Sequence, residues 1–290
     1  MLRPLAGCVD LHLHSTYSDG TLPPAELVAG AAALGLRAIA LSDHDNVDGV
    51  VEAQAAGERL GVEVLAAVEL STVYGRFNDL HLLGYHFDPA MPAFREALLD
   101  FREFRANRGR MIMQRINAKL EHEGRAAIAE AAVLARAGGT LGRPHIGREL
   151  IAAGHVRNME EAFERYLGPC NVAKRYFPIE EAIAMVHAAG GCAVLAHPML
   201  IDGKDDELPA LLDTLSGFGL DGAECWYGSA DNHTTDRMLT LARRRGLLTT
   251  GGSDFHQPGA GLTMGSGLGH LRIAYDCVAE LKERAGRYRN

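Results

Sequence analysis

Short apolar segments alternate with helix-forming segments through most of this 290-residue chain. The candidate strands lie at residues 9–12, 38–42, 62–67, 80–85, 193–196, 222–225 and 248–250. The candidate helices between them start after Pro23 and near residues 50–60, 179–189, 206–217 and 235–246. Strands that alternate with helices predict a largely parallel α/β sheet, either open or closed into a barrel.

Residues 92–177 interrupt this alternation. The stretch from Pro92 to Gly124 has the spacing of one long amphipathic helix, and shorter helices are expected at 126–139, 143–154 and 158–168. We find no convincing strand in this region. The sequence therefore predicts two domains, a barrel made of residues 1–98 and 178–290 and an all-helical insertion at 99–177, which we expect to act as a cap or substrate domain.

The charge of the chain is unevenly distributed around its net value of −8. Residues 101–177 contain 14 Lys and Arg against 8 Asp and Glu, a net of +6, and the remainder contains 15 against 29, a net of −14. A basic segment within an acidic chain indicates a patch for an anionic ligand. The alternative is a helical insertion whose arginines are simply solvated.

Bulk properties are typical of a soluble protein, and we expect it to be cytoplasmic. No apolar run is long enough to span a bilayer, and the N-terminal MLRPLAGCVD lacks the apolar core of a signal peptide. The five cysteines are widely spaced and form no CxxC motif, so we expect buried free thiols. No obligate protein partner is evident from the sequence.

The first candidate strand carries two histidines that alternate with leucines, in the stretch DLHLHSTYSDGT. Residues i and i+2 of a strand share a face, so His12 and His14 would lie side by side. Two adjacent imidazoles can bind one cation. The alternative is a pair of polar residues on a solvated strand face.

Further potential metal ligands recur where the candidate strands end. The residues are His12, His14, Asp19, His44, Glu69, His81, His197, Asp254 and His256. Sites in parallel α/β proteins form at the C-terminal ends of the strands. Each residue alone has an alternative role as a helix cap or turn residue. Their recurrence at six of the seven candidate strands favours a metal site.

The ordered pattern resembles the PHP superfamily, named for polymerase and histidinol phosphatase. It consists of HxH followed by Asp, then SDHD, a single Glu, a single His, an HP dipeptide and SDxH, between residues 10 and 256. The insertion, with GRPHIGRELIAAG and EEAFERYL, resembles the branch of nucleoside 3′,5′-bisphosphate phosphatases, some of which are 5′→3′ exoribonucleases on short RNA. The resemblance implies a distorted (β/α)7 barrel, in agreement with the seven candidate strands.

The same resemblance implies a trinuclear metal centre. Glu69 bridges the first two metals, and the remaining ligands divide into His12, His14 and Asp254 for the first, His81 and His197 for the second, and Asp19, His44 and His256 for the third. Family habit favours Mn²⁺, and a shell of His and carboxylate also suits Fe²⁺ or Zn²⁺. Asp10 and Asp43 are expected to orient neighbouring imidazoles, with turn chemistry as the alternative for Asp10.

The implied reaction is hydrolysis of a phosphate ester by a hydroxide bridging two metals, while the third helps to hold the phosphate. The leading substrate is a nucleoside 3′,5′-bisphosphate such as pAp, which would lose its 3′-phosphate, and short 5′-phosphorylated RNA is a second one. Arg143 and His145 are candidate phosphate contacts at a predicted helix start, and Lys174 and Arg175 are weaker candidates. Trp226 or Tyr227 would either stack a base or pack in the core.

Three other functions stay open on the sequence. A phosphatase of the histidinol phosphate type would act on amino-alcohol phosphates. A non-catalytic PHP module would bind RNA or a polymerase, but it would tolerate missing ligands and none is missing. An amidohydrolase shares the barrel and the metals, and only the basic insertion speaks against it.

Overall fold

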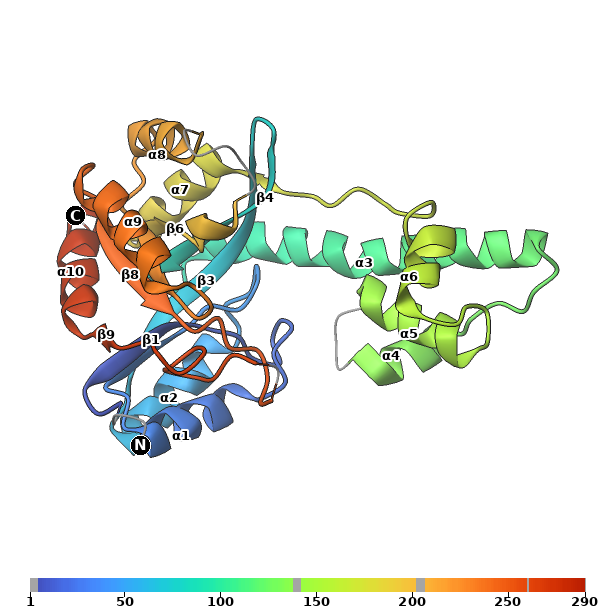
Figure 1. Ribbon diagram of the computed structural model, residues 1–290, viewed down its shortest axis with the longest axis horizontal. Helices are drawn as coiled ribbons and strands as arrows, with labels where there is room; N and C mark the ends of the chain where they lie inside the picture. Colours follow the sequence, from blue (N-terminus) through green and yellow to red (C-terminus); the bar gives the residue numbers. More distant parts are fainter. Residues whose placement is uncertain (1–4, 138–141, 202–206, 260, 290) are drawn as a thin grey trace. The chain divides into compact units, whose positions relative to one another are not determined.

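The computed structural model describes residues 5–137, 142–201, 207–259 and 261–289, and its chain divides into two compact units. The barrel unit consists of Met1–Leu98 and Tyr176–Asn290 and holds all described strands. The helical unit is Leu99–Arg175. The long helix α3 (Pro92–His122) belongs to both units, because the division falls within it (Figure 1).

The barrel unit is built on one mixed sheet that curves into a nearly closed barrel. Its strand order is β8-β7-β6-β4-β3-β2-β1-β9, and the short β5 pairs with β3. The strands are β1 (Cys8–Leu13), β2 (Ala38–Leu41), β3 (Glu63–Tyr74), β4 (Phe77–Tyr85), β5 (Phe177–Pro178), β6 (Cys192–Leu195), β7 (Gly222–Tyr227), β8 (Leu248–Gly252) and β9 (Ile273–Ala274). All seven predicted strands are present, and the predicted α/β barrel is confirmed.

The direction of β4 is the main correction to the predicted sheet. β4 runs antiparallel to both of its neighbours, β3 and β6, whereas the sequence predicted a largely parallel arrangement. Tyr74 pairs with Phe77 across a two-residue loop whose first residue, Gly75, has φ 55°. A Gly at this position is typical of a tight hairpin turn that matches the twist of its strands. This hairpin places Glu69 within β3 and not after its end.

The barrel closes where β8 approaches β1. A parallel bridge joins Leu13 to Phe255, and the amide of His14 donates to the carbonyl of Phe255 over 3.0 Å. A Cβ atom on Gly252 would lie 2.3 Å from the Cβ of His12, so only glycine permits this approach. The closure therefore brings the residues that follow β8 against the first His-rich strand.

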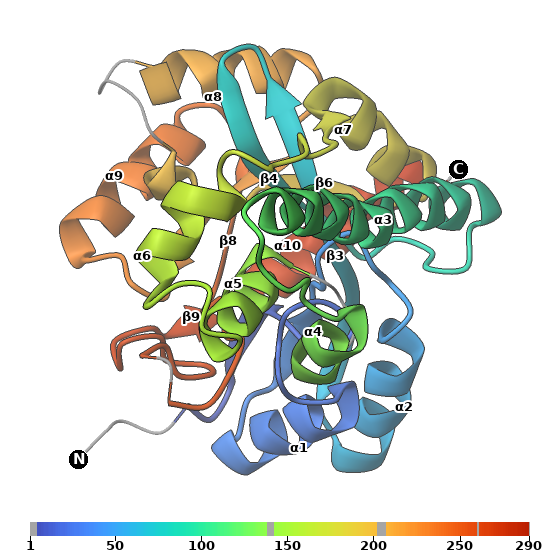
Figure 2. The ribbon, with the colours of Figure 1, turned by 90° about the vertical axis from the view of Figure 1, so that its right-hand side faces the viewer.

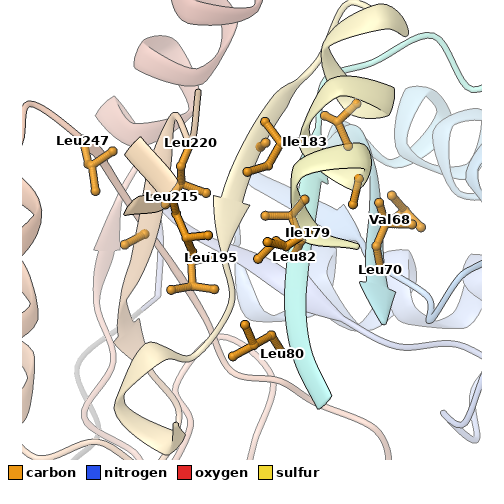
Figure 3. Packing of buried hydrophobic residues seen from close by; sticks show 14 of the residues in the cluster. Val68, Leu70, Leu80, Leu82, Ile179, Ile183, Leu195, Leu215, Leu220 and Leu247 are labelled. Carbon is orange, nitrogen blue, oxygen red and sulfur yellow. The ribbon is translucent and has the colours of Figure 1, made fainter. Parts of the chain in front are cut away.

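Helices pack on the outer face of the sheet in the barrel unit (Figure 1). They are α1 (Pro24–Leu34), α2 (Val50–Leu60), α7 (Ile179–Ala188), α8 (Glu207–Gly217), α9 (Asn232–Arg243) and α10 (Asp276–Ala285). The last of these was not predicted. In Figure 3, Ile179 and Ile183 of α7 pack toward Val68, Leu70 and Leu82 on the β3–β4 hairpin. Burial on this scale contributes about 1.5–3 kcal/mol for each large aliphatic side chain.

The helical unit has its own apolar core, formed by α3 and the shorter helices that follow it (Figure 2). These are α4 (Glu130–Ala137), α5 (Arg143–Ala152) and α6 (Met159–Ala162), the last continued by a π-helical turn, η1 (Phe163–Leu167). None of the described helices has the length and apolar character needed to cross a membrane.

Part of the basic charge of this unit serves the fold itself. Four cationic side chains on or just after α3 donate to backbone carbonyls between residues 155 and 172 over 2.5–2.7 Å, namely Arg108, Arg115, Lys119 and Arg125. These bonds hold the returning chain against the long helix. Fewer cations are therefore left for an anionic ligand than the net charge indicated.

Candidate metal centre

The nine predicted metal ligands converge on one carboxylate in the barrel unit. Glu69 is buried, and five imidazole nitrogens surround its two oxygens. Oε1 lies 2.8 Å from His81 Nδ1 and 3.0 Å from His197 Nε2. Oε2 lies 3.1, 3.2 and 3.3 Å from the nearest ring nitrogens of His12, His14 and His44. Glu69 therefore lies at the centre of the five imidazoles.

Two further carboxylates extend the cluster on one side. Asp254 Oδ1 lies 3.4 Å from His12 Nε2 and 3.1 Å from His14 Nε2. Asp19 lies 3.3 Å from His256 Nε2 and 3.7 Å from His44 Nε2. All nine side chains thus belong to one continuous network of His and carboxylate groups.

Three groups of ligand atoms lie within 4.8 Å of one another and could each hold a cation. The groups are His12, His14, Glu69 and Asp254; His44, Glu69 and His81; and His14, Asp19, His44 and His256. The first has the composition that the family resemblance implies. The other two groups differ from that implied set. His14 and His44 each belong to two groups instead of one, and His197 lies near Glu69 but belongs to none of the three.

Unpaired buried nitrogens indicate that the cluster is suited to cations. Both ring nitrogens of His14 and Nδ1 of His44 are buried without a hydrogen-bond partner. Leaving such atoms unpaired in the interior is costly. A divalent cation would satisfy them together with the carboxylate oxygens that face the same point, so the residues present fit a metal centre.

The electrostatics of the cluster lead to the same conclusion. Burial opposes the ionised form of Glu69, but the nearby His12 and His81 hold its pKa well below its usual range. Burial likewise opposes a charge on His14, yet the nearby carboxylates of Asp254 and Glu69 raise its pKa to about 10. Ionised carboxylates in this interior therefore require positive charge, which either protons on histidine or metal ions can supply.

Serine–aspartate pairs hold the loops that carry the ligands. In each pair, a buried Asp accepts hydrogen bonds from both the backbone N–H and the hydroxyl of one Ser, over 2.6–2.8 Å. The pairs are Asp10 with Ser253, Asp43 with Ser15 and Asp45 with Ser71. They connect β8, β1, β2 and β3, or the residues that directly follow these strands, in turn around the barrel.

Among the hydrogen bonds that the structure describes, neither Asp10 nor Asp43 accepts one from an imidazole. The expectation that they orient neighbouring imidazoles is therefore wrong. Asp10 also accepts a bond of 2.6 Å from the amide of Gly265, and burial raises its pKa. The alternative given for Asp10, a role in turn chemistry, fits these contacts.

Two residues of β7 lie near the cluster, although the sequence analysis named neither as part of the metal site. Glu224 is fully buried, and its Oε1 lies 3.0 Å from His12 Nδ1. Its only sequence signal is an acidic residue inside a short predicted strand. Tyr227 is buried, and its hydroxyl donates to Asp254 Oδ2 over 2.9 Å, so this side chain contacts a proposed ligand. Trp226 packs against two apolar core clusters.

The predicted substrate contacts all lie in the helical unit. Arg143 is the first residue of α5, and its guanidinium lies 5.4 Å from the ring centroid of Phe163. His145 Nδ1 accepts the amide of Gly142 over 3.2 Å, which fixes the orientation of its ring. Arg175 forms an ion pair with Asp100 at 2.7 Å.

Comparison with known proteins decides the family. The model of the PHP domain matches residues 10–168, more than half of the chain. This chain belongs to the PHP family. The family prediction made from the ligand pattern is therefore confirmed.

Curated relatives of this PHP protein match over nearly their whole length. It is 36% identical over 266 residues to a 3′,5′-nucleoside bisphosphate phosphatase of Chromobacterium violaceum, covering 90% of each chain. It is 37% identical over 263 residues to a 5′-3′ exoribonuclease of Haemophilus influenzae, covering 89% of this chain and 93% of the relative. Both relatives belong to the branch that the insertion resembles.

Solved structures show the same fold. A protein of Bifidobacterium adolescentis described as a metal-dependent phosphoesterase superposes with a TM-score of 0.78 at 31% identity, over 97% of this chain and 98% of that one. A Chromobacterium violaceum protein described as an amidohydrolase superposes with a TM-score of 0.76 at 33% identity, over 95% and 96%. This PHP protein therefore shares both its barrel and its insertion with these structures.

Proposed function

We propose that this PHP protein is a metal-dependent phosphoesterase that removes the 3′-phosphate of nucleoside 3′,5′-bisphosphates such as pAp. The observation that carries the proposal is the ring of five imidazole nitrogens around Glu69, together with Asp254 and Asp19. The named activities of the two curated relatives support the choice of a phosphate ester and a nucleotide. Short 5′-phosphorylated RNA is the second proposed substrate.

We assign three divalent cations to the nine side chains, with Mn²⁺ favoured and Fe²⁺ or Zn²⁺ as alternatives. Glu69 would bridge two cations, because its two oxygens face different sets of imidazoles. Bound cations of this kind provide a nucleophilic water at neutral pH and offset negative charge on the phosphoryl group. The chain itself orients these ligands and keeps their carboxylates ionised.

A serine nucleophile is not needed for this reaction, and the described contacts do not favour one. Ser15 and Ser253 are the serines next to the ligands in sequence, and each hydroxyl already donates to an aspartate. Tyr227 donates to Asp254 Oδ2 and leaves Oδ1 directed at His12 and His14. The protein groups therefore serve to position ligands and not to attack phosphorus.

The second phosphate of the substrate is assigned to the start of α5. Arg143 and His145 stand in the first turn of this helix, where an anion is favoured and where a guanidinium can bind phosphate through two hydrogen bonds. Lys174 and Arg175 are weaker candidates, since Arg175 is already paired with Asp100.

Phosphate release tests the proposal. The purified protein, supplied with Mn²⁺, would be given pAp, AMP, a 5′-phosphorylated short RNA and histidinol phosphate under identical conditions. We expect pAp to be hydrolysed fastest by orders of magnitude, with AMP as the product. Turnover of the RNA at a comparable rate would add an exoribonuclease activity.

The same assay separates the alternative functions. Preferred hydrolysis of histidinol phosphate would contradict the nucleotide assignment. An amide substrate belongs in the panel because a similar structure is described as an amidohydrolase. Cleavage of the amide without phosphate release would overturn the phosphoesterase proposal, and bound metal without any turnover would favour a binding module.

A further inference from the structure

Glu224 is a buried carboxylate that contacts two proposed metal ligands at once. It lies on β7, and no part of its side chain is exposed. Oε1 is 3.0 Å from Nδ1 of His12, and Oε2 accepts the backbone N–H of His197 over 2.7 Å. Both carboxylate oxygens are therefore used, each by a different ligand residue.

The contact with His12 crosses the interior of the barrel. Where the barrel closes, β8 lies between β7 and β1, so the Glu224 side chain reaches past β8 to the first strand. β8 comes this close to His12 because it carries Gly252, on which a Cβ would lie 2.3 Å from the Cβ of His12. The opposite ring nitrogen, His12 Nε2, faces Glu69 and Asp254 at 3.1 and 3.4 Å.

The contact with His197 supports an unusual backbone conformation. His197 has φ 27° and ψ 55°, a left-handed region that L-residues seldom occupy, and Pro198 follows it. Such a conformation persists only where surrounding contacts fix it. The carboxylate of Glu224 is one of these contacts, and His197 Nε2 then reaches Glu69 Oε1 at 3.0 Å.

We propose that Glu224 is a positioning residue that holds His12 with its proton on Nδ1 and fixes the backbone of His197, so that both imidazoles present Nε2 to the metal ions. A carboxylate that accepts from His12 Nδ1 leaves the Nε2 lone pair free for a cation. Glu224 thereby couples the ligand sets of two proposed metals without binding either. This inference rests on the proposed metal centre.

Substitution of Glu224 by Gln tests the coupling with almost no change of volume. The amide has one acceptor and one donor end, so it can satisfy His12 Nδ1–H or the His197 N–H, but not both. A donor facing His12 would favour the Nε2–H tautomer, which cannot bind a cation through that atom. We expect the affinity for Mn²⁺ to fall by about 10- to 100-fold, as is common when a group that orients a ligand is lost.

Asp221 provides a matched control on the same segment. It is a buried carboxylate directly before β7 that also binds an imidazole, at 2.8 Å from His187 Nε2, but none of its described contacts is a proposed metal ligand. We expect Asp221→Asn to lower thermal stability while the affinity for Mn²⁺ stays within about twofold of that of the wild type.

Calorimetric titration of metal-free wild type, Glu224→Gln and Asp221→Asn with Mn²⁺ gives the decisive comparison. Unchanged affinity in Glu224→Gln would overturn this inference alone, whereas a wild type that binds no metal would overturn the proposed metal centre as well. If Glu224→Gln does not fold, Glu224→Asp takes its place. This variant keeps the charge, and its loss of Mn²⁺ affinity should be smaller than the loss of about 10- to 100-fold expected for Glu224→Gln. Nitrogen NMR of the Zn²⁺-loaded wild type should show His12 protonated at Nδ1, and protonation at Nε2 would contradict the proposal.

Discussion

Glu69 is the residue on which the proposed chemistry depends most. It is buried on β3, and its charge is stabilised by imidazoles that come from four other segments of the chain. An ionised carboxylate in such surroundings is expensive unless it is paired or binds a metal. The arrangement therefore fits a cation site and does not fit an ordinary apolar core.

Asp254 provides the most direct single-residue prediction. Asp254→Asn replaces a charged oxygen that faces His12 and His14 by a neutral amide. Loss of groups that merely orient ligands costs about 10- to 100-fold, so loss of a direct ligand should lower kcat/KM for pAp by more than about 100-fold. Steady-state phosphate release at saturating Mn²⁺ measures the effect.

Asp231→Asn is the matched control for this substitution. Asp231 caps α9 by accepting the amide of Thr234 over 2.8 Å, and it lies outside the ligand network. We expect little change in thermal stability, because Asn caps a helix about as well as Asp, and an unchanged kcat/KM. Equal activity of the two variants would argue against Asp254 as a ligand.

Arg143 permits a test in which the substrate is varied together with the protein. If Arg143 binds the 5′-phosphate, Arg143→Ala should raise KM for pAp by about 10- to 100-fold, the equivalent of one charged hydrogen-bonded contact. The same variant should hydrolyse 3′-AMP like the wild type, because that substrate has no 5′-phosphate. Arg157→Ala, which removes an exposed guanidinium from the same unit, should change neither.

A similar loss on both substrates would mean that Arg143 acts through the fold of the helical unit. Its contact with Phe163 gives such a structural role a physical basis. Circular dichroism of Arg143→Ala would then show reduced helix content or a lower melting temperature.

The ligands could be predicted from the sequence because their signal is local. His12 and His14 alternate on one strand, and most of the others follow directly after an apolar run. Glu224 could not be predicted in this way, since its role depends on β7 and β1 meeting across β8. The partners of Asp10 and Asp43 were missed for a similar reason, because Ser253 reaches Asp10 only where the barrel closes and Ser15 reaches Asp43 only where β1 pairs with β2.

Among the elements, the junction of β8 with β1 determines whether the site forms at all. Gly252→Ala would place a methyl group against His12, where a Cβ has a backbone nitrogen 2.5 Å away. We expect a loss of about 1–3 kcal/mol in the free energy of unfolding, together with weaker Mn²⁺ binding. Thermal denaturation and metal titration of the same sample measure both effects.

Gly217→Ala is the corresponding control on the outer surface. Gly217 ends α8, and a Cβ there would meet nothing within 4 Å. The substitution should leave metal binding unchanged and either preserve or raise stability, by up to about 1 kcal/mol. Normal Mn²⁺ affinity in Gly252→Ala would contradict the proposed importance of this junction.

The positions of the seven longer strands could be predicted, but the short β5 and β9 and the direction of β4 could not. Apolar runs mark each strand, whereas direction depends on the connection, and the hairpin at Gly75 left only a weak signal between two apolar runs. β3 also extends to Tyr74, seven residues beyond its predicted end at Ala67, because it pairs along the whole of β4. Pairing of this kind is a tertiary effect that periodicity alone does not contain.

At the scale of the whole molecule, protons and metal ions compete for the same site. The pKa of His14 is raised to about 10, and that of His81 to about 9, despite burial, by their carboxylate neighbours. Both are therefore protonated in the metal-free protein at neutral pH, and a cation must displace these protons. Burial lowers the pKa of His44 to about 3, so this residue contributes no proton.

The affinity for Mn²⁺ should consequently rise with pH until about pH 10, the pKa of His14. We expect an increase of about tenfold per pH unit for each displaced proton. Titrations at pH 6, 7 and 8, each in two buffers of different ionisation enthalpy, would give both the affinity and the number of protons released. An affinity that is constant over this range would show that the imidazoles are already neutral before the metal binds.

The most direct test of the proposed function is to measure metal content and pAp hydrolysis on the same sample. Metal-free protein would be titrated with Mn²⁺ while bound metal and phosphate release are recorded together. We predict no hydrolysis without metal and a rate that rises with occupancy to a plateau near three ions per chain. Hydrolysis that survives complete removal of metal, or full occupancy without release of the 3′-phosphate, would contradict it.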